Sequence, residues 1–192
     1  MTRSRAIAEH YTNAWQAEPR ERHWRTGPIG DLPNDFAVLE FAPSEPRNCW
    51  TYATCGMSRA TDAHPIELHL HSPWAAESHV ELLTVVAHYH VTGHALGLGH
   101  TVKFGRPWLP SSGCSYGLIS QPYLDGSHFE WCDLGTAGAM VRLLWLLPIT
   151  EAERECKKRH AQEQLESRLD TCGLDYCDPY RASVAEALGD HK

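Results

Sequence analysis

The chain has 192 residues, a formal net charge of −7 and 42% hydrophobic residues. This length suits one ordinary domain or two small ones, and the composition excludes a wholly disordered chain, a collagen or a coiled coil. The 24 Asp and Glu residues exceed the 17 Lys and Arg residues, which argues against a nucleic-acid-binding surface. No apolar run reaches the roughly 20 residues that a membrane-spanning helix needs.

The cysteine pattern indicates a reducing compartment. The seven cysteines are an odd number, and no two of them form the C-x-x-C pair of zinc ribbons or thioredoxin-type sites. Near the N-terminus, Glu9, His10 and Asn13 interrupt any apolar stretch, so the segment does not read as a secretory signal. We therefore expect a cytoplasmic protein whose cysteines are mostly reduced and half-buried.

Residue spacing predicts helices and strands in mixed order. Helical spacing of apolar residues predicts helices at 3–17, 77–91 and 151–172, and Pro and Gly residues predict a loop at 18–34. Alternating or apolar runs predict strands at 36–41, 49–57, 66–71, 101–104, 116–120, 129–134 and 140–147. Since helices and strands do not alternate strictly, we expect an α+β fold with one sheet.

Two predicted strands have informative patterns. The strand at 66–71 alternates between apolar and polar residues, which predicts one dry face and one polar face carrying His69 and His71. The run at 140–147 is apolar apart from Arg142. A strand that is apolar on both sides is usually central and covered on both faces, so we place this one in the middle of the sheet.

The predicted helix at 151–172 has the fullest set of helix signals. Thr150 and Glu153 have the spacing of a capping box, and Gly173 is placed to end the helix. Two ion pairs at i,i+4 spacing and one apolar stripe are expected along it, namely Glu153 with Lys157, Glu155 with Arg159, and the stripe of Ala161, Leu165 and Leu169.

A histidine motif gives the clearest chemical signal. His90, His94 and His100, with Gly97 between the last two, have the spacing H-x-x-x-H-x-x-G-x-x-H. In metzincins this spacing brings three neutral imidazoles to a zinc ion and leaves a fourth position for water. Val91 stands where those proteases carry their glutamate base, and no methionine turn follows, so we do not expect a protease. A zinc site without protease activity stays open as an alternative, and chance similarity in a glycine-rich turn is favoured over it.

Other candidate residues give weaker signals. Asp125, Glu130 and Asp133 lie close in sequence, but nothing brings them to a common pocket, so a hydrolase built on them or on a serine is the least favoured hypothesis. We expect His79 to be solvated, and Trp108, like Trp74, to lie in a loop as a contact residue. The sequence thus assigns no catalytic residue, no metal ligand and no cofactor.

Eight segments, taken in order, resemble the suppressor of fused (SUFU) domain family in its short bacterial form. They are YATCGMS (52–58), IELHLHSP (66–73), LGLGHTV (96–102), FGRPWLP (104–110), GLISQPYL (117–124), LPITEAE (147–153), QLE (164–166) and DPYRASV (178–184). The resemblance implies one mixed β-sheet with packed helices and no enzymatic activity. It predicts a single SUFU-like domain over 1–192, with an N-terminal helix and loop over 1–30 and the core over 31–186.

The resemblance also implies a class of partner. The larger animal relatives carry an additional C-terminal domain and bind Gli-type transcription factors, whereas bacterial members are associated with polymorphic toxin loci as proposed immunity proteins. We therefore expect a non-enzymatic protein-binding domain whose partner is another protein and neither nucleic acid nor membrane. The net charge of −7 suits a basic toxin domain. The alternative function is a zinc-binding protein that uses His90, His94 and His100.

Overall fold

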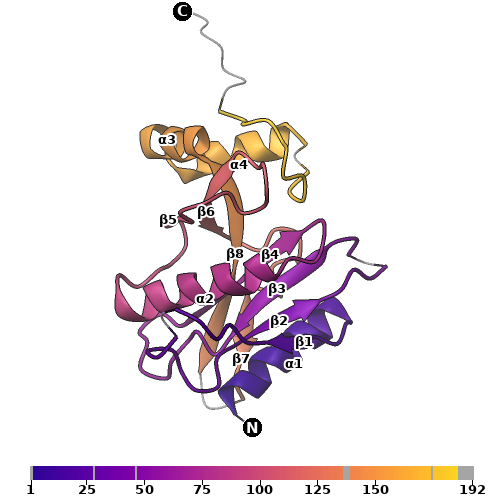
Figure 1. The fold of residues 1–192 in the computed structure, drawn as a ribbon, viewed down its shortest axis with the longest axis vertical. Coiled ribbons are helices and arrows are strands. Elements are labelled where there is room, and N and C mark those ends of the chain that lie inside the picture. The colour runs from indigo at the N-terminus through magenta and orange to yellow at the C-terminus, as the bar shows by residue number, and fades with distance from the viewer. Residues whose placement is uncertain (1, 28, 46, 136–138, 174, 186–192) are drawn as a thin grey trace, which may run out of the picture.

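The computed structural model describes residues 2–185 apart from 28, 46, 136–138 and 174 (Figure 1). Along the chain the elements are α1 (Arg3–Trp15), β1 (Arg20–Arg22), β2 (Ala37–Phe41), β3 (Trp50–Cys55), β4 (Ile66–Ser72), α2 (Glu77–Thr92), β5 (Thr101–Lys103), β6 (Cys114–Ser120), β7 (Trp131–Asp133), β8 (Met140–Thr150), α3 (Glu151–His160) and α4 (Gln162–Thr171). None of the described helices has the length and apolar character needed to cross a membrane.

The strands form one mixed sheet in the order β1-β2-β3-β4-β8-β6-β5, with β7 paired to β8. Strands β4 and β8 run parallel, whereas the other pairs of described strands are antiparallel. The predicted α+β class with one mixed sheet is therefore confirmed. The short edge strand β1 lies inside the stretch 18–34 that was predicted to be a loop, so that prediction is wrong in part.

Strand β8 is the long central strand, as its apolar sequence predicted. Figure 1 shows it extending from the level of α1 up to the α3–α4 pair. Its side chains enter cores on both faces: Val141 and Leu143 pack with one cluster, and Leu144 and Leu146 with another. Near its C-terminal end, Ile149 packs in a third cluster that includes residues of α4.

Helices cover both faces of the sheet. Helix α2 packs its Val80 and Leu83 against the side of β4 that carries Leu68 and Leu70. Helix α1 packs in a second cluster with β2, β3 and β8, through Ala6, Ile7, Tyr11 and Trp15. Each strand near the middle is therefore buried on both of its faces, whatever side chains those faces carry.

Two predictions of exposure in and near α2 are wrong. His79 is fully buried, with its Nε2 atom 3.0 Å from Ser72 Oγ. Trp108 is also buried, at 3% exposed, and its indole stacks on the His79 ring at a centroid distance of 5.6 Å. Trp74 is exposed, as predicted for a contact residue. A neutral imidazole can pack like an aromatic ring, here with Nε2 beside Ser72 and Nδ1 buried without a partner, and sequence spacing alone did not indicate that environment.

The C-terminal helical region consists of two helices rather than one. The helix is interrupted at Ala161, which has φ = 78°. The expected capping box of Thr150 and Glu153 is confirmed at the start of α3. Ala161 is exposed and does not continue the predicted apolar stripe. The change of direction packs Leu165 and Leu169 of α4 against β6 and β8, so the break closes the third hydrophobic cluster.

Glu153 does not form the predicted pair with Lys157. Its carboxylate is fully buried and accepts from Arg181 Nη1 at 2.6 Å and Nη2 at 2.7 Å, and from the Val184 backbone N–H at 3.0 Å. Burial acts to raise the pKa of Glu153, but Arg181 and the backbone donors outweigh burial and lower that pKa. The ion pair ties the C-terminal segment to the start of α3.

The second predicted pair, Glu155 with Arg159, is also absent as a carboxylate contact. Glu155 Oε1 instead accepts from Arg154 at 2.8 Å and from Lys158 at 3.2 Å, while Arg159 Nε donates to the backbone carbonyl of Glu155. Glu155 lies in solvent, where long cationic side chains exchange partners at little cost in free energy. The i,i+4 spacing of Glu155 and Arg159 therefore does not determine which cation the Glu155 carboxylate contacts.

We expect Arg181→Met to lower the free energy of unfolding by about 3–5 kcal/mol, because it leaves the Glu153 carboxylate buried without its ion-pair partner. Lys158→Met removes a cation from the exposed pair with Glu155 and should leave stability at the wild-type value. Urea denaturation followed by circular dichroism measures both. Equal losses of stability in the two variants would contradict a structural role for the buried pair.

Burial of His79 makes the fold sensitive to acid. Burial lowers the pKa of His79 to about 4, and the charge of Arg106 acts in the same direction. An unfolded histidine has a pKa of about 6.5, so between these values the unfolded state binds more protons than the folded state. Stability is therefore complete above about pH 6.5 and falls as the pH decreases toward 4.

We expect the His79 contribution to reduce the free energy of unfolding by about 2 kcal/mol at pH 5 relative to pH 8. His79→Gln should flatten the dependence of stability on pH over this range, whereas the exposed control His64→Gln should not. Denaturation curves at several pH values measure the slopes. An unchanged slope in His79→Gln would show that this imidazole does not link protonation to folding.

Candidate functional site

The polar face of β4 is buried, although the sequence predicts only that it is polar. Glu67 and His69 are 0% exposed and His71 is 2% exposed. The ring of His69 contacts Trp15 of α1 at a centroid distance of 5.6 Å and Phe129 at 5.3 Å. Polar groups removed from water need partners inside the protein, so each of these three side chains defines an internal polar site.

Glu67 organises the turn after β3. Its two carboxylate oxygens accept from the backbone N–H groups of Gly56 (3.1 Å), Met57 (3.2 Å) and Ser58 (3.0 Å), from Ser58 Oγ (2.7 Å) and from Thr54 Oγ1 (2.6 Å). Burial raises the pKa of Glu67, and these donors act in the opposite direction. With its oxygens fully occupied, Glu67 has a structural role.

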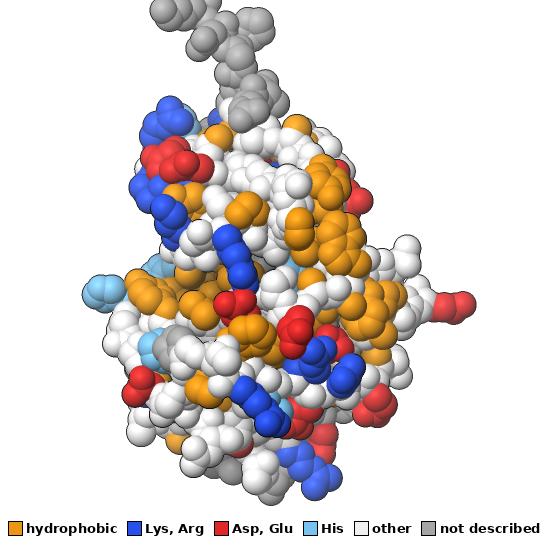
Figure 2. Space-filling model, viewed as in Figure 1, with side chains coloured by type: hydrophobic (Ala, Val, Ile, Leu, Met, Phe, Trp, Pro, Cys, Tyr) orange, Lys and Arg blue, Asp and Glu red, His pale blue; other side chains and the backbone are white. Residues whose placement is uncertain are grey.

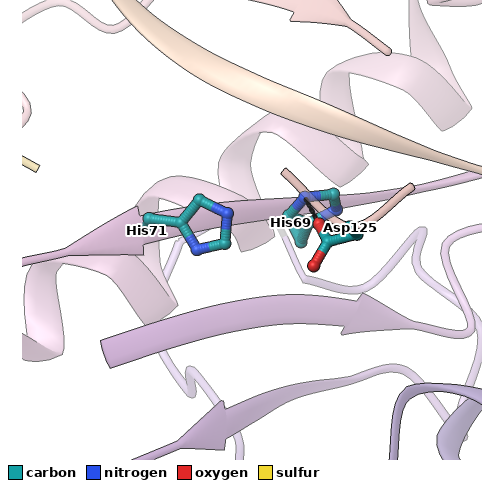
Figure 3. Close-up of side chains that lie close together, drawn as sticks. All are labelled: His69, His71 and Asp125. Atoms are coloured by element: carbon teal, nitrogen blue, oxygen red, sulfur yellow. Dashed lines mark ion pairs between the residues drawn. The ribbon is translucent and has the colours of Figure 1, made fainter. Parts of the chain in front are cut away.

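His69, His71 and Asp125 form a cluster that we name the His–Asp cluster (Figure 3). The histidines project side by side from β4, and Asp125 reaches them from the segment between β6 and β7. One ligand atom of each residue lies within 4.8 Å of the others, and His69 Nε2 is 3.4 Å from Asp125 Oδ2. No other set of three or more His, Cys, Asp or Glu side chains among the described residues has this arrangement.

The surroundings of the His–Asp cluster fix part of each side chain. Asp125 Oδ1 accepts from Trp15 Nε1 at 2.8 Å and forms an ion pair with Arg47, whose guanidinium lies over the Trp15 ring. Thr51 Oγ1 lies 3.1 Å from His71 Nδ1, and Arg47 Nη1 lies 3.3 Å from the same nitrogen. The other oxygen of Asp125 and the other nitrogen of His71 face the interior of the cluster.

Protonation in the cluster follows from burial and charge. Burial lowers the pKa of His69 to about 4, although Asp125 acts in the opposite direction. For Asp125, burial acts to raise the pKa, but His69 and the charge of Arg47 more than offset burial and hold the pKa well below its usual range. At neutral pH the cluster therefore contains an ionised Asp125 and a neutral His69.

A cysteine pair adjoins the cluster. Cys49, just before β3, interacts with Cys177 of the C-terminal segment, and both are half-buried. The interaction with Cys177 lowers the pKa of the Cys49 thiol to about 4 against the effect of burial, and His71 and Arg47 act with it. The pKa of Cys177 is raised instead. Within the pair, Cys49 therefore ionises more readily than Cys177.

We expect Cys49 to react first with a disulfide reagent such as dithiodipyridine at about pH 5, at least tenfold faster than the exposed Cys172. Cys177→Ala should slow the modification of Cys49, because it removes the largest influence that lowers the thiol pKa. Peptide mass spectrometry of samples quenched at several times, with chelator present, gives the rates. Faster modification of Cys172 would contradict the lowered pKa of Cys49.

The histidines of the H-x-x-x-H-x-x-G-x-x-H motif do not converge on a common ion. His90 is buried at the end of α2, where its Nδ1 accepts from the Leu96 backbone N–H at 2.9 Å. His94 and His100 are exposed. His90 and His100 line a hollow of about 790 Å³, together with Leu98, Trp131 and Arg142 among others. The structure thus gives no support to the zinc alternative built on this motif.

The three carboxylates near the β6–β7 connection also have separate environments. Asp125 is in the His–Asp cluster, Glu130 pairs with Arg142 at 2.6 Å, and Asp133 accepts from the Gly135 backbone N–H at 2.8 Å. The side chain of Asp125 is buried, at 2% exposed, which the sequence did not indicate. Sequence could have pointed to the cluster through one signal, the two histidines on a strand next to an apolar central strand.

Comparison with known proteins identifies the family. The family model described as suppressor of fused protein (SUFU) matches residues 33–182, well over half of the chain. The chain belongs to the suppressor of fused family. This confirms the resemblance seen in the sequence, and the SUFU fold is the α+β arrangement with one mixed sheet described above. The comparison with curated protein sequences gave no match.

Solved structures of SUFU proteins share this fold. A SUFU homolog from Neisseria gonorrhoeae is 32% identical, with a TM-score of 0.82 over 95% of this chain and 96% of that one. The Sufu–Fu complex matches with a TM-score of 0.72 and 17% identity, over 97% of this chain and 93% of that one. Drosophila Suppressor of Fused gives a TM-score of 0.68 and 17% identity, over 96% of this chain but 51% of its own.

Proposed function

We propose that this SUFU-family chain is a non-enzymatic protein-binding domain that neutralises a toxin domain as an immunity protein of a bacterial polymorphic toxin system. The observation that carries the binding role is the likeness to the Sufu–Fu complex, a SUFU chain solved with a second protein, which extends over 97% of this chain. The 32% identity to the Neisseria homolog supports a bacterial setting. The chain acts in the cytoplasm, where a toxin must be held inactive.

The distribution of polar groups supports a binding role over catalysis. Among the described residues, the candidate carboxylates Asp125, Glu130 and Asp133 each have a separate partner. Ser112 is buried and accepts hydrogen bonds from Trp108 and from the Cys114 backbone N–H. A hydrolase needs a nucleophile and a base within hydrogen-bond reach of one substrate position, and these residues do not provide that arrangement.

Exposed apolar side chains provide contact area for a partner. Figure 2 shows apolar side chains in patches across the middle of one face, between the α3–α4 pair and α2, with acidic and basic side chains beside them. In the described chain, Tyr180, Leu124 and Tyr123 are the most exposed large apolar residues, at 64%, 55% and 53%. Aromatic residues with a polar tip are enriched at protein interfaces.

Tyr123 combines exposed apolar area with a neighbouring negative charge. Its hydroxyl donates to Glu166 Oε2 at 3.1 Å, and a small hollow beside it is lined by Glu166, Asp170 and Tyr176. We name Tyr123, Glu166 and Asp170 the acidic aromatic patch. A basic toxin domain would be steered by the net charge of −7 and would meet this patch with complementary charge.

Co-expression with the toxin domain encoded beside its gene tests the proposal. We expect the chain to restore growth and to bind the toxin domain in a salt-dependent way. The double variant Glu166→Lys/Asp170→Lys should weaken binding at least tenfold at low salt. The control Glu18→Lys/Glu45→Lys changes the net charge equally at two exposed positions and should bind nearly as well as wild type.

Failure to restore growth or to bind the toxin domain by calorimetry would contradict the immunity role. Equal losses of affinity in both double variants would leave the binding role standing but would show that the acidic aromatic patch is not the binding site. Circular dichroism of each variant confirms that the fold is unchanged.

A further inference from the structure

Three buried atoms of the His–Asp cluster face one another without hydrogen-bond partners. They are His69 Nε2, His71 Nε2 and Asp125 Oδ2, and each has lost contact with water. Buried polar atoms in native proteins are nearly always bonded to protein, water or an ion. Three electron-pair donors left unpaired at one place indicate that the protein binds something with which all three can bond.

The spacing of these donors suits a small metal ion. Zinc bonds to histidine nitrogen and carboxylate oxygen at about 2.0–2.2 Å, so two ligands of a tetrahedral site lie about 3.3–3.5 Å apart. His69 Nε2 and Asp125 Oδ2 are 3.4 Å apart, and ligand atoms of all three residues lie within 4.8 Å. His71 has to turn toward the other two side chains to bring all three ligand atoms to tetrahedral spacing.

The neighbouring residues orient the donors as a metal site requires. A metal-bound histidine usually donates its second ring N–H to a protein acceptor. Thr51 Oγ1 lies 3.1 Å from His71 Nδ1 and takes this role when Nε2 binds an ion and Arg47 Nη1, 3.3 Å from the same nitrogen, turns away, because a guanidinium can only donate. Trp15 Nε1 and Arg47 hold Asp125 Oδ1, which leaves Oδ2 directed at the histidines.

Charge and donor type restrict the choice of ion. Calcium and magnesium prefer oxygen ligands alone, whereas two imidazole nitrogens with one carboxylate oxygen suit zinc. Asp125 is ion-paired with Arg47, and its Oδ2 atom, 3.4 Å from His69 Nε2, is the one carboxylate oxygen of the site.

We propose that His69, His71 and Asp125 bind one zinc ion, which joins β4 to the segment between β6 and β7. Three protein ligands leave a fourth tetrahedral position. The side chains are buried at 0% (His69), 2% (His71) and 2% (Asp125) exposed, which is typical of an ion that supports the fold. This site is separate from the His90, His94 and His100 motif and from the acidic aromatic patch.

Zinc content of the untagged protein tests the proposal. The chain is purified without a histidine tag, treated with chelator, mixed with Zn²⁺, and freed of excess metal before mass spectrometry. We expect about one equivalent of zinc and a higher midpoint of thermal unfolding with zinc than with chelator. A folded wild-type chain that retains no zinc at micromolar concentrations would overturn the proposal.

Variants separate this site from other histidines. Asp125→Asn and His71→Asn should each weaken zinc binding at least tenfold, because a direct ligand contributes no less than the groups that orient it. Thr51→Val should weaken binding about 10–100-fold while the ligands stay intact. Two controls should retain zinc: His79→Asn changes a buried histidine outside the cluster, and His94→Ala changes the sequence motif.

Unchanged zinc affinity in Asp125→Asn, or loss of zinc in His94→Ala, would overturn the assignment. If the cluster variants do not fold, X-ray absorption of the zinc-loaded wild type decides. Two imidazole ligands at about 2.0–2.1 Å with oxygen completing most of the shell would support the cluster, and a shell dominated by sulfur would exclude it.

Discussion

The burial of the polar face of β4 is the constraint on which much of this structure depends. Strand β4 lies between β3 and β8, and α1 with the segment after β6 covers the face that carries Glu67, His69 and His71. An unpaired polar group at this depth costs about 1–3 kcal/mol, so each side chain requires its own partners. The turn after β3, the position of Arg47 and the path of the chain around Asp125 all meet this requirement.

Sequence patterns predicted those elements whose signals are local. The apolar run of β8 predicted a central strand, and the capping box at Thr150 predicted the start of α3. The alternation in β4 correctly separated its two faces, but it did not show what covers the polar one. The polar face of β4 is covered by α1 and by the segment around Asp125, each more than fifty residues from His69 in sequence. No local stretch of sequence around His69 therefore predicts that this face is buried.

The candidate site was missed for the same reason. Asp125 reaches His69 from another part of the chain, and its partner Arg47 comes from a third. The motif of His90, His94 and His100 was conspicuous because its residues are close in sequence, yet two of them are exposed and the third binds the backbone. The ordered family resemblance was more informative, because it compares the whole path of the chain rather than one spacing.

The single parallel pair among the described strands has a consequence for how the chain folds. Ile66 of β4 is paired in register with Arg142 of β8, whereas β1 to β4 join through shorter antiparallel connections. During synthesis the first four strands can therefore assemble while β8 is still missing, and β4 is then an open edge. Charged and polar side chains on an open edge discourage pairing with other chains. Until β8 and Asp125 are in place, Glu67, His69 and His71 are therefore polar side chains that this open edge strand carries.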